Sequence, residues 1–467
     1  MSQNFIFFDV ETSGINKYFG QIFQFAAILT DENFRVLDRF EIRSKRMSHI
    51  IPEPGALLVT GILPTQLENA KYTYYEFSSL IREKMLEWSP ATFCGYNSLK
   101  FDEPFMRSMY YQNLYSPYLS QTNGNKRIDI LPMVFAMEHL FPEALCFPLN
   151  EKGKTSKKLE HIAVSNGFEN HNAHDAMGDV LATIHMAKLI KSRVPSLWNN
   201  CNYCSSRQDF NKFIKNKNWV LIHDNNNGWP ITFPGVEISR VNDDRDSLFY
   251  DLRYSVEKIA RNSLDQNFSG RDRPFRMVRN SNMPIIFDRD EINSLNVSGL
   301  DLRLLDDLAT QIKSDAKVKA AASQFQNAFS DYQQSPHIEE QIYKDFESFN
   351  NNRSLMEKFH NANPQEKLAI ATQFTDERFR AFARRIVFDN FQSYMCKVDI
   401  EEYKTLIIER INSTDDVPWN TVGSAIQNCE VLVEKSNFCK RDVDVIKKYY
   451  ETLGSLNSPA AYGASQR

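Results

Sequence analysis

Near its N-terminus the chain reads Phe5-Ile6-Phe7-Phe8-Asp9-Val10-Glu11-Thr12, an aromatic and apolar run that carries two carboxylates. The run predicts a buried strand. Because side chains alternate along a strand, Asp9 and Glu11 project to the same side, with their Cα atoms about 7 Å apart. Two acids this close repel each other unless a cation lies between them, and Mg²⁺ binds one or two carboxylates while leaving room for substrate phosphates. The alternative is a strand end whose acids are simply solvated.

The length and composition of the chain limit the classes of protein to which it can belong. The chain has 467 residues, more than one hydrophobic core usually holds, so we expect two or three domains. It has no apolar run of about 18 residues and no signal-peptide pattern at its start, which predicts a soluble, cytoplasmic protein. Seven cysteines, an odd number, argue against a disulfide framework, and Cys201-x-x-Cys204 has no second pair to complete a zinc site. The net charge of −4 neither requires nor excludes nucleic acid.

The first part of the chain alternates between strand-like and helical runs, which predicts a mixed α/β domain. Strands are expected over residues 5–10, 21–30, 36–42 and 92–97, the first three as a meander. Helices are expected over residues 75–86, 103–115, 130–140 and 175–190. Around the second of these helices, Tyr111, Tyr115 and Tyr118 recur at helical spacing, which predicts that they share one face.

Further acids follow these elements. Asp102 comes just after the strand at 92–97, and Asp179 lies in the first turns of the helix that His174 precedes. Asp175 suits the N-cap of that helix, and Asp129 suits the N-cap of the helix at 130–140. An isolated histidine before a helix more often has a structural role. Because His174 occurs together with Asp9, Glu11 and Asp102, we favour a catalytic role for it.

Three motifs in order carry a family resemblance. The motifs are Asp9-x-Glu11, Tyr96-Asn97-x-x-x-Phe101-Asp102 and His174-x-x-x-x-Asp179. Together they resemble the motifs of the exonuclease superfamily with four acids and a histidine. Within it, several segments are similar to the bacterial exodeoxyribonuclease I family, namely Gln24-Phe25-Ala26-Ala27-Ile28, Pro54-Gly55-Ala56, Thr60-Gly61-Ile62, Lys158-Leu159-Glu160-His161 and Asn172-Ala173-His174-Asp175-Ala176-Met177. The likeness is dense over residues 5–195 and diffuse beyond them.

The resemblance implies a ribonuclease H-like domain in which Asp9, Glu11, Asp102 and Asp179 bind two Mg²⁺ ions, with Mn²⁺ as an alternative. The chemistry agrees, because two metal ions about 4 Å apart can stabilise both the attacking and the leaving oxygen of a phosphodiester displacement. Neutral His174 would accept a proton from the attacking water, since histidine has an ordinary pKa of about 6.5. Glu11 would also contact the terminal nucleotide.

The resemblance also suggests contacts with single-stranded DNA, each of which has a structural alternative. Lys158 stands where the family has arginine, in a lysine-rich stretch that equally suits a solvated loop. Arg107 and Tyr118 match DNA-contacting positions, the tyrosine by stacking on a base, although core packing would also use a tyrosine there. Thr122 stands where the family has a tryptophan, which puts one stacking platform in doubt. The other matching positions are Arg207, Arg276, Tyr343 and Phe346, the last two of which equally suit core packing.

We expect three domains, an exonuclease domain over residues 1–192, an SH3-like domain over 196–330 and a helical C-terminal domain over 333–467. Residues 191–200 read as a linker. The middle domain is rich in short strand-like runs, at 219–223, 236–239, 247–252 and 275–278. Its SH3-like assignment rests on the resemblance. A cluster of Arg271, Arg273, Arg276 and Arg279 suits a phosphate groove, or alternatively a charged, solvated edge strand.

The sequence therefore predicts a monomeric, Mg²⁺-dependent exonuclease that removes 5′-mononucleotides from the 3′ end of single-stranded DNA in repair and recombination. The polarity, the preference for DNA and one partner, the acidic tail of single-stranded DNA-binding protein, rest on the resemblance alone. One alternative is a 3′–5′ exoribonuclease, which the length beyond a single domain disfavours. The other is a catalytically dead nucleic-acid-binding module, which the presence of all four acids and the histidine disfavours.

Overall fold

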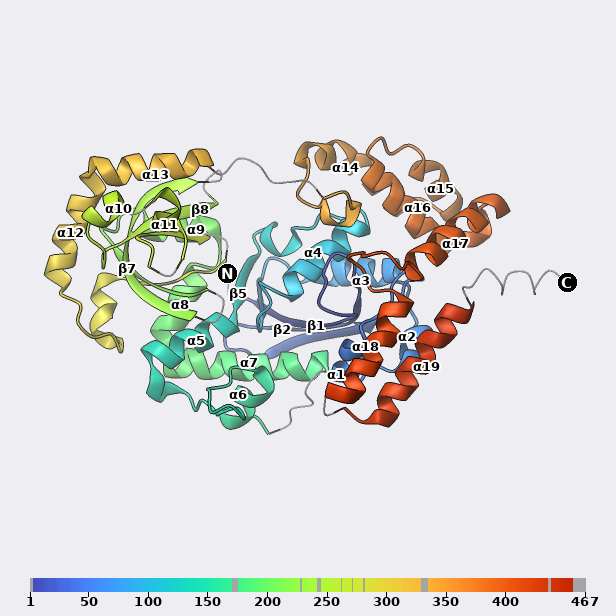
Figure 1. Cartoon of the computed structure of the whole chain (residues 1–467), viewed down its shortest axis with the longest axis horizontal. Helices are drawn as coiled ribbons and strands as arrows, with labels where there is room; N and C mark the ends of the chain where they lie inside the picture. The colour runs from blue at the N-terminus through green and yellow to red at the C-terminus, as the bar shows by residue number, and fades with distance from the viewer. Residues whose placement is uncertain are drawn as a thin grey trace.

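The computed structural model contains two five-stranded sheets with helices around and between them (Figure 1). It describes residues 3–169, 175–226, 229–241, 245–261, 263–270, 272–279, 282–328, 335–435 and 438–456. Among these residues, no helix is both long and apolar enough to cross a membrane.

The first sheet has the strand order β3-β2-β1-β4-β5. β1 pairs antiparallel with β2, and β2 with β3, which confirms the predicted meander. β4 and β5 continue the sheet in parallel on the other side of β1. The sequence did not predict β5, because three of its four residues are charged. The bounds are β1 (Phe5–Thr12), β2 (Ile22–Thr30), β3 (Val36–Arg43), β4 (Thr92–Gly95) and β5 (Lys126–Asp129).

Strand β1 is buried on both faces of this sheet. Phe5 and Phe7 belong to the core on the side of α5 (Ile130–Leu140) and α7 (Ala176–Arg193). Ile6, Phe8 and Val10 belong to the opposite core, with α3 (Tyr74–Glu87) and α4 (Asp102–Gln112). Figure 1 shows α7 on one side of the sheet and α3 and α4 on the other. Since Asp9 and Glu11 continue the row of Phe5 and Phe7, their carboxylates lie on the side of α7.

Helix α4 ends earlier than predicted. Its last residue is Gln112, and Leu114 takes a left-handed backbone conformation with φ of 63°, which stops the helix. Tyr115 and Tyr118 therefore lie beyond the helix, and the prediction that they share a helical face with Tyr111 is wrong. Tyr111 is buried in a core shared with the C-terminal helices, whereas Tyr115 stacks on His360 with ring centroids 3.8 Å apart.

The predicted linker over residues 191–200 is wrong. α7 runs to Arg193, and α8 (Pro195–Tyr203) follows after a single residue. Trp198 of α8 is 2% exposed and packs against Phe5 and Phe34, with ring centroids 5.7 and 5.3 Å away. The polar residues of this segment predicted a linker, but its apolar residues pack in the core of the first sheet.

The second sheet has the order β10-β6-β7-β8-β9 and is antiparallel throughout. Its four longest strands confirm the strand-like runs predicted for the middle domain. Within the described residues β9 and β10 are edge strands, so the sheet is open and no closed barrel is seen. The strands are β6 (Val220–Asn226), β7 (Trp229–Val241), β8 (Asp246–Asp251), β9 (Phe275–Arg279) and β10 (Ile285–Phe287). Nearby helices are α9 (Arg207–Ile214), α10 (Glu257–Arg261), α11 (Leu264–Phe268), α12 (Leu302–Ser314) and α13 (Ala316–Ala328).

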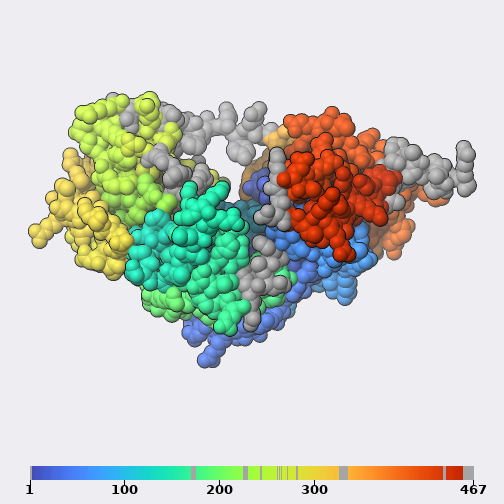
Figure 2. All heavy atoms as spheres, turned by 60° about the horizontal axis from the view of Figure 1, so that its bottom comes forward, coloured from blue at the N-terminus to red at the C-terminus, as the bar shows by residue number. Residues whose placement is uncertain are grey.

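The described residues from 346 onward form helices, as predicted. Helices α18 and α19 share a core with α1 and α2 of the first part of the chain. Figure 2 shows the C-terminal helices and the second sheet as separate masses at opposite ends of the molecule. The C-terminal helices are α14 (Phe346–Asn361), α15 (Pro364–Ala371), α16 (Glu377–Phe391), α17 (Lys397–Ile411), α18 (Val422–Lys435) and α19 (Lys440–Leu456). The remaining elements are α1 (Pro54–Thr60), α2 (Pro64–Asn69), α6 (Leu159–Ser165) and the 3₁₀ turns η1 (Leu119–Gln121), η2 (Pro142–Ala144), η3 (Arg289–Ser294), η4 (Ile338–Glu340) and η5 (Gln392–Tyr394).

The packing of α8 generates a stability prediction. Trp198→Ala removes a buried ring from the core beside Phe5, so we expect the free energy of unfolding to fall by roughly 3–5 kcal/mol. The measurement is thermal unfolding followed by circular dichroism. Asn199→Ala, an exposed position of the same helix, is the control and should leave the melting temperature unchanged within about 1 °C. Equal melting temperatures for the two variants would show that α8 is not part of this core.

Candidate active site

Three carboxylates meet at the end of β1. Ligand oxygens of Asp9, Glu11 and Asp179 all lie within 4.8 Å of one another. Asp9 and Glu11 come from the strand, and Asp179 comes from the first turns of α7. The start of that helix is fixed by Asp175, whose carboxylate accepts a hydrogen bond from the backbone N–H of Gly178 at 3.4 Å, as predicted for an N-cap. The predicted proximity of these three acids is therefore confirmed.

The fourth acid, Asp102, is 3% exposed and lies against the same strand. Its Oδ1 accepts a hydrogen bond from the backbone N–H of Val10, the residue between Asp9 and Glu11, at 3.1 Å. Asp102 opens α4, so the position of its carboxylate depends on the loop that leads into that helix. Asp102 thus joins the other acids from a separate element.

The loop before α4 is held by Asp129. The carboxylate of this residue accepts hydrogen bonds from the backbone N–H groups of Asn97 at 2.8 Å, Leu99 at 3.1 Å and Leu131 at 3.1 Å. The bond to Leu131 caps α5 and confirms the predicted N-cap, while the other two fix the turn in which Asn97 has φ of 62°. Burial raises the pKa of Asp129 to about 6, and the three backbone donors oppose that shift. The sequence did not reveal this second role of the capping residue.

The electrostatics of the acid cluster favour a cation. Burial and the charges of Asp102 and Asp179 raise the pKa of Asp9 well above its ordinary value. Burial and the same two neighbours raise the pKa of Glu11 to about 9, and burial chiefly raises that of Asp102 to about 8. Carboxyl groups with such values resist being ionised together, and a divalent ion removes that resistance by placing positive charge between them. The donor set, four carboxylates at one strand end, fits a divalent metal site.

A polar cluster surrounds Asp175 at the edge of this site. Gln24 Nε2 donates hydrogen bonds of 2.9 Å to both Asp175 Oδ1 and Glu41 Oε1, and Arg43 Nη2 lies 3.3 Å from Asp175 Oδ1. These contacts tie the beginning of α7 to β2 and β3. His174, the predicted general base, immediately precedes Asp175 and lies outside the described residues, so its role stays a prediction.

Three of the predicted DNA-contacting residues lie together. Arg107 Nη1 is 3.4 Å from the hydroxyl of Tyr343, which is 59% exposed. Tyr118 is close enough to both residues for their electrostatic effects to reach it. Burial and the neighbouring Tyr343 raise the pKa of Tyr118, and the positive charge of Arg107 opposes the shift. In addition, Arg107 Nε is buried and has no hydrogen-bond partner among the described residues. We define Arg107, Tyr118 and Tyr343 as the arginine–tyrosine cluster.

Two residues that the sequence did not single out support this cluster. Glu103 is 3% exposed, and its Oε2 lies 3.5 Å from Arg107 Nη2 and 3.7 Å from Arg127 Nη1. Ser120 donates a further hydrogen bond of 2.7 Å to the same oxygen. The sequence contained one sign of this pairing. Glu103, directly after Asp102, is four residues before Arg107 on α4, and residues at this spacing face each other.

The other predicted contacts are dispersed. Lys158 is exposed and pairs with Glu160 at 3.3 Å, and Arg207 is exposed in the first turn of α9. Arg276 is 4% exposed, and its Nε donates to the buried carboxylate of Asp251 at 2.8 Å. These contacts give Arg276 a structural role in the second sheet, and its contact with DNA stays a prediction. Phe346 opens α14, but its side chain is outside the described set.

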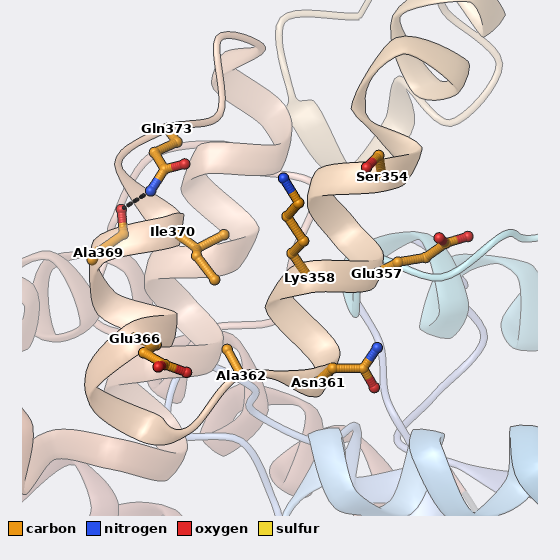
Figure 3. Close-up of a pocket in the computed structure, with 9 residues that line it drawn as sticks. All are labelled: Ser354, Glu357, Lys358, Asn361, Ala362, Glu366, Ala369, Ile370 and Gln373. Carbon is orange, nitrogen blue, oxygen red and sulfur yellow. Dashed lines mark hydrogen bonds between the residues drawn. The ribbon is translucent and has the colours of Figure 1, made fainter.

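A separate hollow of about 640 Å³ lies between α14 and α15 (Figure 3). Lys358 and Ile370 face each other across it, and Gln373 bonds the Ala369 carbonyl at its rim. Its lining residues include none of the four acids and none of the arginine–tyrosine cluster. They are Ser354, Glu357, Lys358, Asn361, Ala362, Glu366, Ala369, Ile370 and Gln373.

Comparison with known proteins shows what the chain is similar to. Residues 6–187, less than half of the chain, match the exonuclease family RNase_T. The resemblance to exodeoxyribonuclease I is also confirmed. The chain is 40% identical to exodeoxyribonuclease I of Escherichia coli (strain K12) over 198 residues, and 27% identical to that of Haemophilus influenzae over 405 residues. The first match covers 42% of this chain and 41% of the relative, so it spans less than half of each protein, and the second covers 80% and 84%.

Solved structures share the whole fold. The E. coli exonuclease I complex with a dA16 oligonucleotide superposes with a TM-score of 0.83 at 23% identity, covering 97% of this chain and all of that one. Two further structures superpose with TM-scores of 0.80 and 0.81, an SSB/exonuclease I complex with the inhibitor CFAM and a zinc-bound complex of E. coli exonuclease I with single-stranded DNA. Their identities of 23% and 22% support a common fold.

The acid cluster generates a pH prediction. A carboxyl group whose pKa is higher in the folded than in the unfolded state makes the free energy of unfolding fall as pH rises between the two values. For Glu11 this window runs from its ordinary value of 4.5 to about 9. Since a bound divalent ion relieves the repulsion, we expect millimolar Mg²⁺ to raise the melting temperature by several degrees near pH 8.5 and by much less near pH 5.5.

Differential scanning fluorimetry with and without the ion measures this effect. The variant Glu11→Gln has one acid fewer, so both its loss of stability with rising pH and its gain from Mg²⁺ should be smaller. A gain from Mg²⁺ that is the same at both pH values, and the same in the variant, would contradict a metal site at this cluster.

Proposed function

We propose that this protein is an exonuclease that hydrolyses single-stranded DNA from its 3′ end and releases 5′-mononucleotides. The observation that carries the proposal is the meeting of Asp9, Glu11 and Asp179 within 4.8 Å, with Asp102 hydrogen-bonded to the strand that carries Asp9 and Glu11, inside the region that matches an exonuclease family. The DNA substrate is supported by the exodeoxyribonuclease I relatives and by the oligonucleotide complex of the E. coli protein.

Asp9, Glu11, Asp102 and Asp179 would hold the divalent ions, and we propose Mg²⁺ as the metal, two ions per site, with Mn²⁺ as an alternative. When bound, such ions polarise the scissile phosphate and stabilise the charge that develops on the attacking and leaving oxygens. All four ligands are carboxylates, the oxygen donors that Mg²⁺ prefers, and the set contains no soft sulfur ligand.

The chain's own residues supply the remaining chemistry. His174 precedes the helix that carries Asp179, and its neutral imidazole would accept the proton of the attacking water near neutral pH. Gln24 and Arg43 hold Asp175, the residue that follows His174 in the sequence. Glu11 would in addition contact the terminal nucleotide, and Lys158 would offer a cation to a phosphate.

The arginine–tyrosine cluster is proposed to hold the strand behind the scissile bond. The Arg107 guanidinium is partly exposed and would offer a cation to a phosphate. Tyr343 is exposed enough to stack on a base, with Tyr118 beside it. Arg207, Arg276 and Phe346 are proposed as further contacts, on an SH3-like middle domain and a helical C-terminal domain that flank the exonuclease domain.

The remaining parts of the proposal rest on the relatives. We propose a monomeric, cytoplasmic enzyme of DNA repair and recombination. The solved SSB/exonuclease I complex supports single-stranded DNA-binding protein as a partner, and we propose that its C-terminal tail is the part that binds. The proposed domain limits stay at residues 1–192, 196–330 and 333–467, although the packing of Trp198 on Phe5 favours counting α8 with the first of them.

Asp179→Asn tests the catalytic assignment. The change removes one metal ligand and leaves the arginine–tyrosine cluster intact, so we expect cleavage of a 3′-labelled single-stranded oligonucleotide to fall at least about 10³-fold while its Kd changes less than about twofold. Cleavage is measured by gel electrophoresis at millimolar Mg²⁺ and binding by fluorescence anisotropy. Asp444→Asn, an exposed acid on α19, is the matched control and should behave as wild type.

The same assay separates the rival functions. Wild-type protein that degrades RNA faster than DNA would indicate an exoribonuclease. Wild-type protein that binds both but cleaves neither at any Mg²⁺ or Mn²⁺ concentration would indicate a binding module, and it would overturn the proposal. Retained cleavage in Asp179→Asn would refute the assignment of the four carboxylates.

Tyr343→Ala tests the arginine–tyrosine cluster. Loss of a stacking platform costs about 1–3 kcal/mol per base, so we expect the Kd for a single-stranded oligonucleotide to rise about 5- to 100-fold. Tyr394→Ala, a 50% exposed tyrosine of η5, is the control for removing an exposed aromatic ring and should bind as wild type. If both variants bind equally well, Tyr343 does not contact the strand.

A further inference from the structure

The segment before α1, residues 51–53, contacts the loop after β1 on one side and the C-terminal region on the other. On its inner side, the backbone N–H of Glu53 donates to the carbonyl of Ser13 at 2.7 Å. The backbone N–H of Ile15 donates in turn to Glu53 Oε1 at 3.2 Å. Gly14 lies so close that a Cβ there would be 2.2 Å from Glu53 Oε1. Glu53 therefore clamps the loop that follows the last residue of β1, Thr12.

On its outer side, the same segment is held from the end of the chain. Asn420 Nδ2 donates to the carbonyls of Ile51 at 3.2 Å and Pro52 at 2.8 Å. The hydroxyl of Tyr450, a fully buried residue of α19, donates to the Pro52 carbonyl at 2.9 Å. Three hydrogen bonds from the C-terminal region thus end on the two residues that precede Glu53.

A second contact reaches the loop from the same region. Asn16 Nδ2 donates to the Pro418 carbonyl at 3.0 Å, and Phe19 packs on Trp419 with ring centroids 5.7 Å apart. The guanidinium of Arg410 lies 4.2 Å from the Trp419 ring and forms an ion pair of 3.3 Å with the buried Glu339. The loop after β1 is therefore supported along its length by residues that follow position 409.

Apolar packing makes this support rigid. Ile51 and Leu57 share a buried core with Val422, Ala425 and Tyr450. Figure 1 places α18 and α19 beside α1, and Figure 2 shows the C-terminal helices against the first part of the chain. A well-packed core of this kind transmits a small displacement instead of absorbing it.

We propose that Asn420 and Tyr450 are positioning residues for the active site. They hold Ile51 and Pro52, which fix Glu53, which fixes residues 13–15 and so the end of β1 from which Glu11 projects. Catalytic carboxylates need placement within about 0.5 Å, so loosening this clamp lowers the rate of the chemical step rather than the affinity for DNA. The inference rests on the proposed nuclease function, and it gives the C-terminal region a part in catalysis separate from any contact with the strand.

The double variant Asn420→Ala/Tyr450→Phe tests the proposal, because it removes the three outer hydrogen bonds and keeps the buried ring of α19. In single-turnover reactions with enzyme in excess, we expect removal of the first nucleotide to slow at least about 10-fold. The Kd for the same oligonucleotide, measured without metal, should change less than about twofold. Tyr449→Phe is the matched control, since it removes a 2.7 Å hydrogen bond from α19 to Glu68 but none to residues 51–53, and its rate should equal that of wild type.

Hydrogen exchange gives a readout that does not depend on activity. Amides of residues 12–16 should exchange at least about 10-fold faster in the double variant than in Tyr449→Phe, while amides of β4 and α5 stay protected. Glu53→Ala should reproduce both effects, and Glu53→Gln, which keeps an acceptor for the Ile15 N–H, should restore them to near wild type.

The outcomes separate this inference from the function on which it rests. A wild-type protein that cleaves no DNA would overturn the function, and hydrogen exchange would still report on the clamp. Unchanged exchange at residues 12–16, or an active wild type whose rate the double variant matches, would overturn the inference alone. A parallel fall in rate and affinity would also overturn it, because it would indicate a lost DNA contact instead.

Discussion

Mutual repulsion among buried carboxylates is the constraint on which the rest of this structure depends. The pKa values of Asp9, Glu11 and Asp102 are raised because each carboxylate is buried and has negatively charged neighbours. Nothing in their own chemistry brings such groups together without a cation, so the surrounding structure must do so. The two apolar faces of β1 stabilise this arrangement, because they pack the strand between two hydrophobic cores up to the residue where the first acid appears.

Three backbone devices place the four acids. Pleating alone sets Asp9 and Glu11 side by side. Asp179 is delivered by a helix start that Asp175 caps, and Asp102 by a turn whose N–H groups converge on Asp129. The capping and turn-forming acids, Asp175 and Asp129, accept these backbone hydrogen bonds and are distinct from the four acids proposed to bind metal.

How much of this the sequence foretold depends on the range of the interactions. Strand alternation placed Asp9 and Glu11, and motif order placed Asp102 and Asp179, since these signals are local or belong to a recognisable family pattern. The sequence did not predict the end of α4, because a leucine gives no sign that its backbone will adopt the left-handed conformation of Leu114. The packing of Trp198 on Phe5, the pairing of Glu103 with Arg127, and the contact of Asn420 with Pro52 join residues far apart in the chain, where local patterning carries no information.

The bond from Tyr450 to the Pro52 carbonyl spans 398 positions, and it has a consequence for the order in which the protein is made. Chains fold from the N-terminus as they emerge from the ribosome, so the sheet and its four acids can assemble long before α19 exists. The loop after β1 then lacks its outer support until Tyr450 has emerged. Under the proposed clamp, the end of β1 takes its final geometry only after α19 has been made, so the strand and its support form at different times.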